Sequence, residues 1–364
     1  MPAPAPTNHD EAAYSDSASG PAALASSHLD AAVLFIRRFS FCIGLLGLSV
    51  AVAHSAEPAS SAARVKSLKI TILSTMVADN GPGGSRLGEW GFSALVEADG
   101  HRILFDTGAS QDVVRRNAAT MQIDLGTVPD VVLSHSHWDH VTGFLPLRDS
   151  VKEKNPTGLA RTHVAEGIFL PRHLAKTGVP FNPLLVVRPD YERGGGVFVV
   201  HPRAVQLFPG VWLTGPVPRK HDEKNWPVGN VQLTTPRGLV DDNLPEDMSL
   251  VCDTDAGLVV LTGCGHAGAI NIVEHARNTV RHARVHALIG GLHLFNATDE
   301  TLTWTAERLR EVGVDYFLGG HCTGLETVYR YRRDLALDRA RAVVAAVGAS
   351  FELGKGIEPG TIAR

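Results

Sequence analysis

Residues 135–140 constrain the fold more than any other stretch, because four metal-ligand side chains fall within six positions: His135, His137, Asp139 and His140. The apolar, β-branched run 129–133 before this cluster is typical of a buried strand. Residues 141–145 after it are typical of the first turn of a helix. The sequence therefore predicts that these side chains gather where a strand ends and a helix begins.

The spacing within this cluster indicates a site for metal ions. Side chains of an extended chain alternate between two sides, so His135 and His137 point the same way. Asp139 and His140 lie past the turn and can face a second point nearby. Two nitrogen ligands for one ion, and one oxygen with one nitrogen for another, suit zinc or a similar transition metal. A histidine-rich surface loop is the alternative, but four such residues at this spacing favour metal binding.

The composition is that of an ordinary soluble globular protein. The chain has 364 residues, enough for a sizeable core, of which 44% are hydrophobic and 20% are charged. A formal net charge of −4 without a basic run argues for no nucleic-acid partner, and the expected partner is a small-molecule substrate. The four cysteines are too few and too scattered for a disulfide framework: Cys42, Cys252, Cys264 and Cys322.

The N-terminal segment predicts export. Residues 1–32, rich in Ala, Ser and Pro, indicate a disordered or mis-started extension. Residues 33–56 have the pattern of a signal peptide, with Arg37 and Arg38 before a short uncharged run and a small-residue cleavage site. The arginine pair also fits a twin-arginine signal loosely. We expect an exported, periplasmic protein with a linker at 57–67 and no stable membrane span. An uncleaved segment that anchors the chain in a membrane is the alternative.

Three more predicted strands deliver a histidine at their ends. Runs 257–262, 285–291 and 316–320 are short and apolar, and they lead to His266, His293 and His321. Helical spacing follows three of these four histidine-bearing strand ends, which predicts layered sheets with helices outside. Ligands collected from strand ends would form one rim, where a metal site would lie.

The middle of the chain, residues 150–245, is less informative. It is rich in Pro and Gly and has short predicted strands, so we expect scaffold and substrate-facing loops rather than a separate domain. Its histidines lack ligand spacing and are expected to be surface or hydrogen-bonded residues: His163, His173, His201 and His221.

The cluster at 135–140, the Asp-Thr-Gly at 106–108 and the late histidines together resemble the signature of the metallo-β-lactamase fold superfamily, over residues 68–350. The resemblance implies an α/β fold, the αββα sandwich of two facing mixed sheets with helices outside, followed by a C-terminal tail at 351–364. It also implies two divalent metal ions, zinc or else manganese or iron. The first ion would be bound by His135, His137 and His266. The second would be bound by Asp139, His140 and His321.

The resemblance also suggests roles for residues around these ligands. Asp106 resembles the aspartate that supports the metal loop through hydrogen bonds. The family usually has a bridging aspartate where Gly290 and Gly291 stand here. His293 could replace that bridge, contact the substrate or stack nearby. Cys264 and Cys322 are either small buried residues in tight turns, oxidisable thiols or soft metal ligands.

Segments 261–268, 290–294 and 320–324 narrow the resemblance to one branch, the 7,8-dihydropterin-6-yl-methyl-4-(β-D-ribofuranosyl)aminobenzene 5'-phosphate synthase-like metallo-hydrolases. The first hypothesis is a hydrolase whose metal-activated hydroxide attacks an ester, lactone, amide or phosphoester, with Asp139 also orienting the nucleophile. The alternative is a transferase that condenses a dihydropterin pyrophosphate with an arylamine-type acceptor. A non-catalytic metal-binding or redox-sensing protein is the second alternative. The sequence does not indicate an oligomeric state.

Overall fold

The computed structural model describes residues 63–363 except 224 and 226–229. The expected extension at 1–32 and the expected signal peptide at 33–56 lie outside the described residues, so both stay predictions. Within the described part, none of the helices has the length and apolar character that a membrane span requires.

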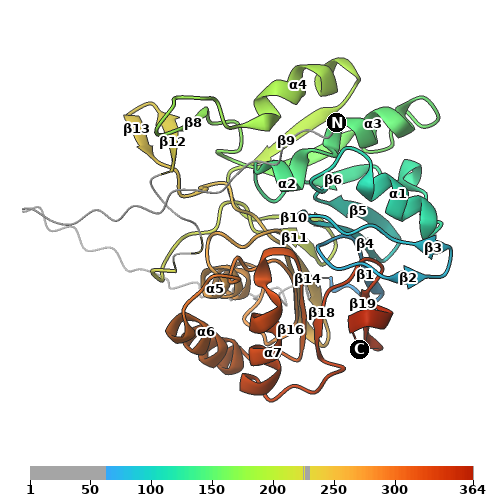
Figure 1. The fold of residues 1–364 in the computed structure, drawn as a ribbon, viewed down its shortest axis with the longest axis vertical. Helices are drawn as coiled ribbons and strands as arrows, with labels where there is room; N and C mark the ends of the chain where they lie inside the picture. Colours follow the sequence, from blue (N-terminus) through green and yellow to red (C-terminus); the bar gives the residue numbers. More distant parts are fainter. Residues whose placement is uncertain (1–62, 224, 226–229, 364) are drawn as a thin grey trace, which may run out of the picture. The chain divides into compact units, whose positions relative to one another are not determined.

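Among the described residues, the first of two large sheets has eight strands in the order β20-β19-β1-β4-β5-β6-β7-β9. Figure 1 labels β1, β4, β5 and β6 in the middle of this sheet. Pairing is antiparallel from β20 to β5 and parallel from β5 to β9. Asp99 and Gly100, between β4 and β5, both have positive φ (46° and 86°), the combination that a tight hairpin turn favours. The strand bounds are β1 Leu68–Ser74, β4 Ser93–Ala98, β5 His101–Phe105, β6 Asp130–Val132, β7 Arg161–Ala165, β9 Val197–His201, β19 Ser350–Glu352 and β20 Gly356–Glu358.

The second sheet has seven strands in the order β10-β11-β14-β15-β16-β17-β18, and β15 to β18 run parallel. Parallel neighbours need crossover connections, and helices α5, α6 and α7 provide them. The bounds of the strands are β10 Val205–Phe208, β11 Val211–Leu213, β14 Leu250–Thr254, β15 Gly257–Thr262, β16 Val285–Gly290, β17 Tyr316–Gly319 and β18 Ala342–Val344. Those of the helices are α5 Ala269–Thr279, α6 Asp299–Val312 and α7 Leu325–Asp334.

The core has three layers of apolar side chains, which follow from the alternation of side chains along each strand. On β5, Ile103 and Phe105 pack in the cluster between the two sheets, whereas Leu104 packs against the helices on the outer face. Those helices are α1 Val113–Thr120, α2 Trp138–Val141, α3 Phe144–Lys152 and α4 Pro183–Arg193. A third cluster joins the second sheet to α5, α6 and α7, which lie on its outer side in Figure 1. The predicted αββα sandwich is therefore confirmed.

The segment 150–245 does not form a separate layer. It contributes β7, α4 and β9 to the first sheet and its outer helices, and β10 and β11 to the edge of the second sheet. Its remaining strands form a small sheet of β8 Arg172–Leu174, β12 Val231–Thr235 and β13 Gly238–Asp241. A two-stranded ribbon of β2 Asn80–Gly81 and β3 Gly84–Ser85 lies before β4.

The C-terminal residues belong to the first sheet. The sequence places the end of the domain at residue 350, but β19 pairs with β1 at Ser350, Phe351 and Glu352, and β20 pairs with β19. Phe351 is fully buried in the core between the sheets. The folded domain therefore continues past the expected boundary, because the tail supplies an edge strand.

Candidate metal centre

Three histidines from both sheets converge at one rim of the sandwich. His135 and His137 follow β6, and His266 follows β15. One ring nitrogen from each lies within 4.8 Å of the others, and all three side chains are buried. Gly265 and Gly268, both at positive φ (64° and 101°), allow the tight turn that brings His266 to this point. We call these three residues the first group.

Hydrogen bonds on the far side of the rings fix their orientation. His135 Nδ1 lies 2.9 Å from Ser134 Oγ, and His266 Nδ1 lies 3.0 Å from the backbone oxygen of Asn225. With the proton on Nδ1, each Nε2 keeps its lone pair for the site. His135 Nε2 is buried and has no hydrogen-bond partner among the described residues. A buried nitrogen of this kind is costly unless a ligand pairs with it, so the group fits a divalent metal ion.

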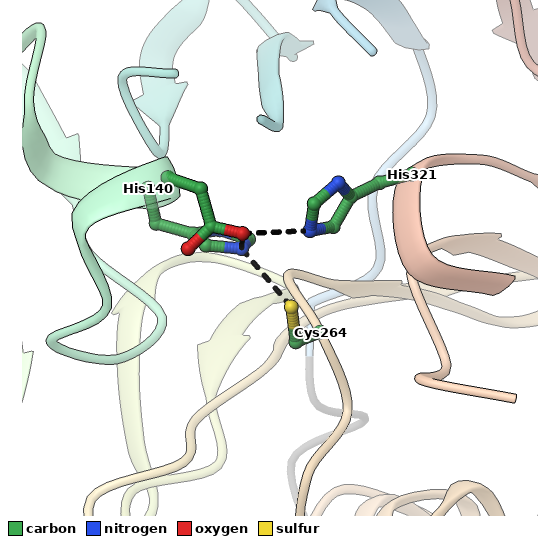
Figure 2. A group of neighbouring side chains, drawn as sticks. His140, Cys264 and His321 are labelled. Atoms are coloured by element: carbon green, nitrogen blue, oxygen red, sulfur yellow. Dashed lines mark hydrogen bonds and ion pairs between the residues drawn. The ribbon is translucent and has the colours of Figure 1, made fainter. Parts of the chain in front are cut away.

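A second group lies beside the first and adds a carboxylate and a thiol. Asp139, His140, Cys264 and His321 each place a ligand atom within 4.8 Å of the others. Asp139 Oδ2 lies 3.2 Å from His321 Nε2, and His140 Nε2 lies 3.1 Å from Cys264 Sγ (Figure 2). The sequence assigned three of these residues to one ion, and the structure adds Cys264 to them.

Asp106 orients side chains of both groups through hydrogen bonds. Its carboxylate is buried and accepts three hydrogen bonds of 2.7 Å, from Ser134 N, Ser134 Oγ and His140 Nδ1. Because Ser134 in turn contacts His135, one carboxylate orients a histidine of each group. Asp106 adopts φ 53°, a conformation that is uncommon outside glycine and that turns the chain after β5 towards the rim.

His293 lies next to the two groups, without joining either of them. Its ring centroid is 4.5 Å from that of His266, and it forms a third group with Cys264 and Cys322. A Cβ atom added at Gly291 would lie 2.3 Å from Gly263 O and 2.9 Å from Cys322 Sγ, which is too close for either neighbour. A bridging aspartate therefore has no room at Gly291, whereas Cys264 Sγ lies beside Asp139 and His140, where it could serve as a ligand.

Burial and neighbouring charges set the protonation of these residues. Burial, reinforced by the imidazoles around it, lowers the pKa of His135 well below its usual value, and burial lowers the pKa of His137 to about 3. Burial opposes ionisation of Asp139, but His140 and His321 outweigh it and lower its pKa. Neutral imidazoles and an ionised carboxylate are the forms that bind metal ions.

His321 behaves differently from the other histidines. Burial acts against a charge on its ring, but Cys322 and Asp139 outweigh burial and raise its pKa to about 10. A proton on His321 competes with a cation for the same nitrogen, so cation binding to the second group would release a proton.

A buried charge network that the sequence did not predict contacts the loop 133–137, which carries His135 and His137. Glu246 accepts a hydrogen bond from Ser136 Oγ (2.9 Å) and forms an ion pair with Arg172 Nη2 (2.5 Å). Arg172 also pairs with Asp242 at 2.7 Å, and the side chains of this ion triad are fully buried. Next to Glu246, Asp247 accepts a 2.6 Å hydrogen bond from Ala267 N, beside His266. These contacts link the small sheet to the loops that carry His135, His137 and His266.

A cavity of about 300 Å³ opens onto both groups. Its outer walls are aromatic: Trp90 packs edge-on against Phe295 at 5.5 Å between ring centroids, and Phe181 packs against His137 at 6.0 Å. Trp138, Asn296, His293 and Cys322 also line it, and no Lys or Arg is among the described residues that form it. A larger cavity, about 620 Å³, is lined by residues around Glu223 and Trp304 and contains no member of either group.

The histidines of the middle segment stay outside the centre. His163 contacts His201 at 3.0 Å and Asp130 at 3.1 Å, so it is a hydrogen-bonded buried residue. His173 pairs within the small sheet, and His221 lies 3.0 Å from Glu274.

The comparisons with known proteins agree with this fold. Residues 91–217 match the family model of the metallo-beta-lactamase superfamily. The structure is similar to that of a metal-dependent hydrolase of the beta-lactamase superfamily, with a TM-score of 0.60 and 26% identity, over 79% of this chain and 99% of the other. The chain is thus an αββα protein with a candidate metal centre at its rim, and both its sequence and its fold are similar to those of the metallo-beta-lactamase superfamily.

The chain also resembles the branch that its glycine-rich strand ends indicated. It is 27% identical over 258 residues to the 7,8-dihydropterin-6-methyl-4-(beta-D-ribofuranosyl)-aminobenzene-5'-phosphate synthase of Methanocaldococcus jannaschii, a match that covers 69% of this chain and 86% of that protein. A second protein of the same archaeon, whose function is uncharacterised, is 25% identical over 242 residues, which is 65% of this chain and 85% of that protein.

Proposed function

We propose that the protein is a metal-dependent hydrolase that binds two divalent cations, zinc or else manganese or iron. The observation that carries this proposal is the pair of adjacent buried groups at one cavity, with three imidazoles in one group and a carboxylate, two imidazoles and a thiol in the other. His135, His137 and His266 would hold the first cation. Asp139, His140 and His321, with Cys264, would hold the second. Bound cations of this kind lower the pKa of water to about 7 and so supply hydroxide at neutral pH.

The chain's own residues would position the reactants. Asp139 faces His321 within the second group and stays ionised, so it can accept a hydrogen bond from the attacking water and orient it. Asp106 and Ser134 hold the histidine rings in place, which lowers the reorganisation needed during the reaction. The aromatic walls would exclude bulk water from the reacting atoms.

The cavity lining supports an uncharged substrate with an apolar or flat portion. Trp90, Phe181 and Phe295 offer ring surfaces, whereas the described lining residues offer no guanidinium or ammonium group for a phosphate. Among esters, lactones, amides and phosphoesters, the lining therefore favours an ester, lactone or amide.

A transferase is the second candidate, and one specific observation favours it. The relative at 27% identity over 258 residues is named a dihydropterin–aminobenzene phosphate synthase. A condensation assay with a dihydropterin pyrophosphate and arylamine acceptors separates the two functions. Product formation would favour transfer, and hydrolysis of esters or lactones without such a product would favour the hydrolase.

The test uses full-length protein reconstituted with zinc or manganese and a panel of esters, lactones, amides and phosphoesters. His137→Ala should abolish the hydrolysis that the wild type shows, because it removes a nitrogen of the first group. His282→Ala, at an exposed position, is the matched control and should keep full activity. Hydrolysis that survives both chelation and His137→Ala would refute the proposal. Stoichiometric metal binding without any activity would favour a non-catalytic metal-binding or sensing role.

A further inference from the structure

Two buried cysteines meet at the metal centre. Cys264 Sγ and Cys322 Sγ lie 3.3 Å apart, and neither residue is part of a disulfide. Both residues line the cavity that opens onto the histidines, so a small solute that enters the cavity reaches them. We propose that Cys264 and Cys322 are a modification site, where a peroxide or a small disulfide reversibly oxidises the pair to a disulfide bond.

The local geometry favours this bond. A disulfide needs about 2.05 Å between its sulfur atoms, so the two sulfurs must approach by just over 1 Å. Cys264 lies between Gly263 and Gly265, and the backbone of Gly265 is at φ 64°, so the chain around this sulfur carries little side-chain bulk. Cys322 Sγ accepts a hydrogen bond from His293 N (3.3 Å), which holds it on the side that faces Cys264.

The third described cysteine provides an internal contrast. Cys252 is also fully buried, but it lies on β14 in the core between the sheets and lines none of the described cavities. Burial raises its pKa to about 12, so it stays a thiol. Position at the cavity, and not burial, therefore distinguishes the pair.

The reaction with hydrogen peroxide is balanced in two steps. One sulfur attacks the peroxide, the O–O bond breaks, and a sulfenic acid and one water molecule form. The other sulfur attacks the sulfenic sulfur, the S–S bond forms, and a second water molecule leaves with the remaining proton. Two thiols are oxidised to one disulfide while one peroxide is reduced to two water molecules. A small disulfide can replace the peroxide through thiol–disulfide exchange, which releases two thiols.

Oxidation would alter the second group, because Cys264 belongs to both the pair and that group. Cys264 Sγ lies 3.1 Å from His140 Nε2 and would be the one sulfur ligand beside Asp139 and His321. A sulfur in a disulfide no longer offers a thiolate, so the second group would lose one donor and bind its cation more weakly. This consequence rests on the proposed metal binding, whereas formation of the bond does not.

The first experiment tests the bond itself. Full-length protein is treated with hydrogen peroxide near stoichiometric amounts, alkylated, digested and mapped by mass spectrometry. We expect one cross-linked peptide pair, Cys264 with Cys322, that a reductant reverses, while Cys252 is alkylated only after unfolding. Sulfinic acid on Cys264 with Cys322 still reduced, or no cross-linked peptide at all, would overturn the proposal.

Variants separate the bond from its consequence. Cys322→Ser and Cys264→Ser should each abolish the cross-link, and Cys252→Ala should keep it. For the wild type, cation content measured by elemental analysis should fall from two equivalents to about one after oxidation and return after reduction. A cross-link that forms without any change in cation content would refute the effect on the second group. Failure of the hydrolase proposal alone would leave the cross-link and the cation measurement unaffected.

Discussion

Replacing Asp106 with asparagine changes the orientation of both groups through a single side chain. The carboxylate accepts three buried hydrogen bonds of 2.7 Å, two of them at Oδ2, from Ser134 Oγ and His140 Nδ1. Asparagine keeps one acceptor for Ser134 N, but its amide presents N–H groups where Oδ2 accepted. His140 then loses the partner that keeps its proton on Nδ1, and His135 loses the ordered Ser134 hydroxyl.

The magnitude follows from these contacts. Supporting partners of metal-binding histidines typically contribute about 10–100-fold to cation affinity, which is about 1.4–2.7 kcal/mol. We therefore expect Asp106→Asn to weaken zinc binding by about that factor, measured by competition with a coloured chelator at fixed pH. Asp112→Asn is the matched control, because that carboxylate is half-exposed and pairs with Arg116 on the surface. Zinc affinity of Asp106→Asn within about threefold of the wild type would refute the supporting role.

Three further changes test other parts of the centre. Burial raises the pKa of Asp247 from 3.8 to about 6. Because the folded protein holds this proton more tightly than the unfolded chain, the free energy of unfolding should be higher below pH 4 than above pH 6, by up to about 3 kcal/mol. Asp247→Asn should remove this dependence in denaturant titrations, and an unchanged pH profile would contradict the shift. Ser136→Ala leaves Glu246 without its hydroxyl donor and should lower the free energy of unfolding by about 1–3 kcal/mol. Phe295→Ala removes an aromatic wall and should raise KM for aryl esters about tenfold with little change in kcat, whereas an unchanged KM would place the substrate elsewhere.

Two surface variants are suitable controls for the last two changes. Ser150→Ala removes a hydroxyl that bonds only within α3, and Tyr329→Ala removes an exposed ring from α7. Ser150 does not contact Glu246 and Tyr329 does not line the cavity, so Ser150→Ala should leave the free energy of unfolding unchanged and Tyr329→Ala should leave KM unchanged.

Local patterns in the sequence predicted the part of the site that lies close together in the chain. His135, His137, Asp139 and His140 are separated by one or two positions, so the short stretch from the end of β6 into α2 is enough to bring them to one rim. His266 and His321 were predicted because each follows an apolar strand with glycines at its end. The structure brings both to the same rim, since the strands that carry them, β15 and β17, run parallel.

The other parts of the site and of the fold depend on tertiary contacts that no local sequence pattern encodes. Cys264 joins the second group because the turn after β15 points its sulfur at His140. Arg172 and Glu246 are separated by 74 residues and meet only when the small sheet packs on the metal loop. The strands β19 and β20 were missed because they are short, and β19 pairs with β1 from the opposite end of the folded domain.

Anomalous diffraction from crystals of the zinc-reconstituted protein tests the central claim most directly. The account predicts two zinc peaks, one about 2.0–2.1 Å from Nε2 of His135, His137 and His266, and one bound by Asp139, His140, Cys264 and His321. His137→Ala should lower the occupancy of the first peak. Zinc bound at another place on the surface, with no peak between these side chains, would contradict the account.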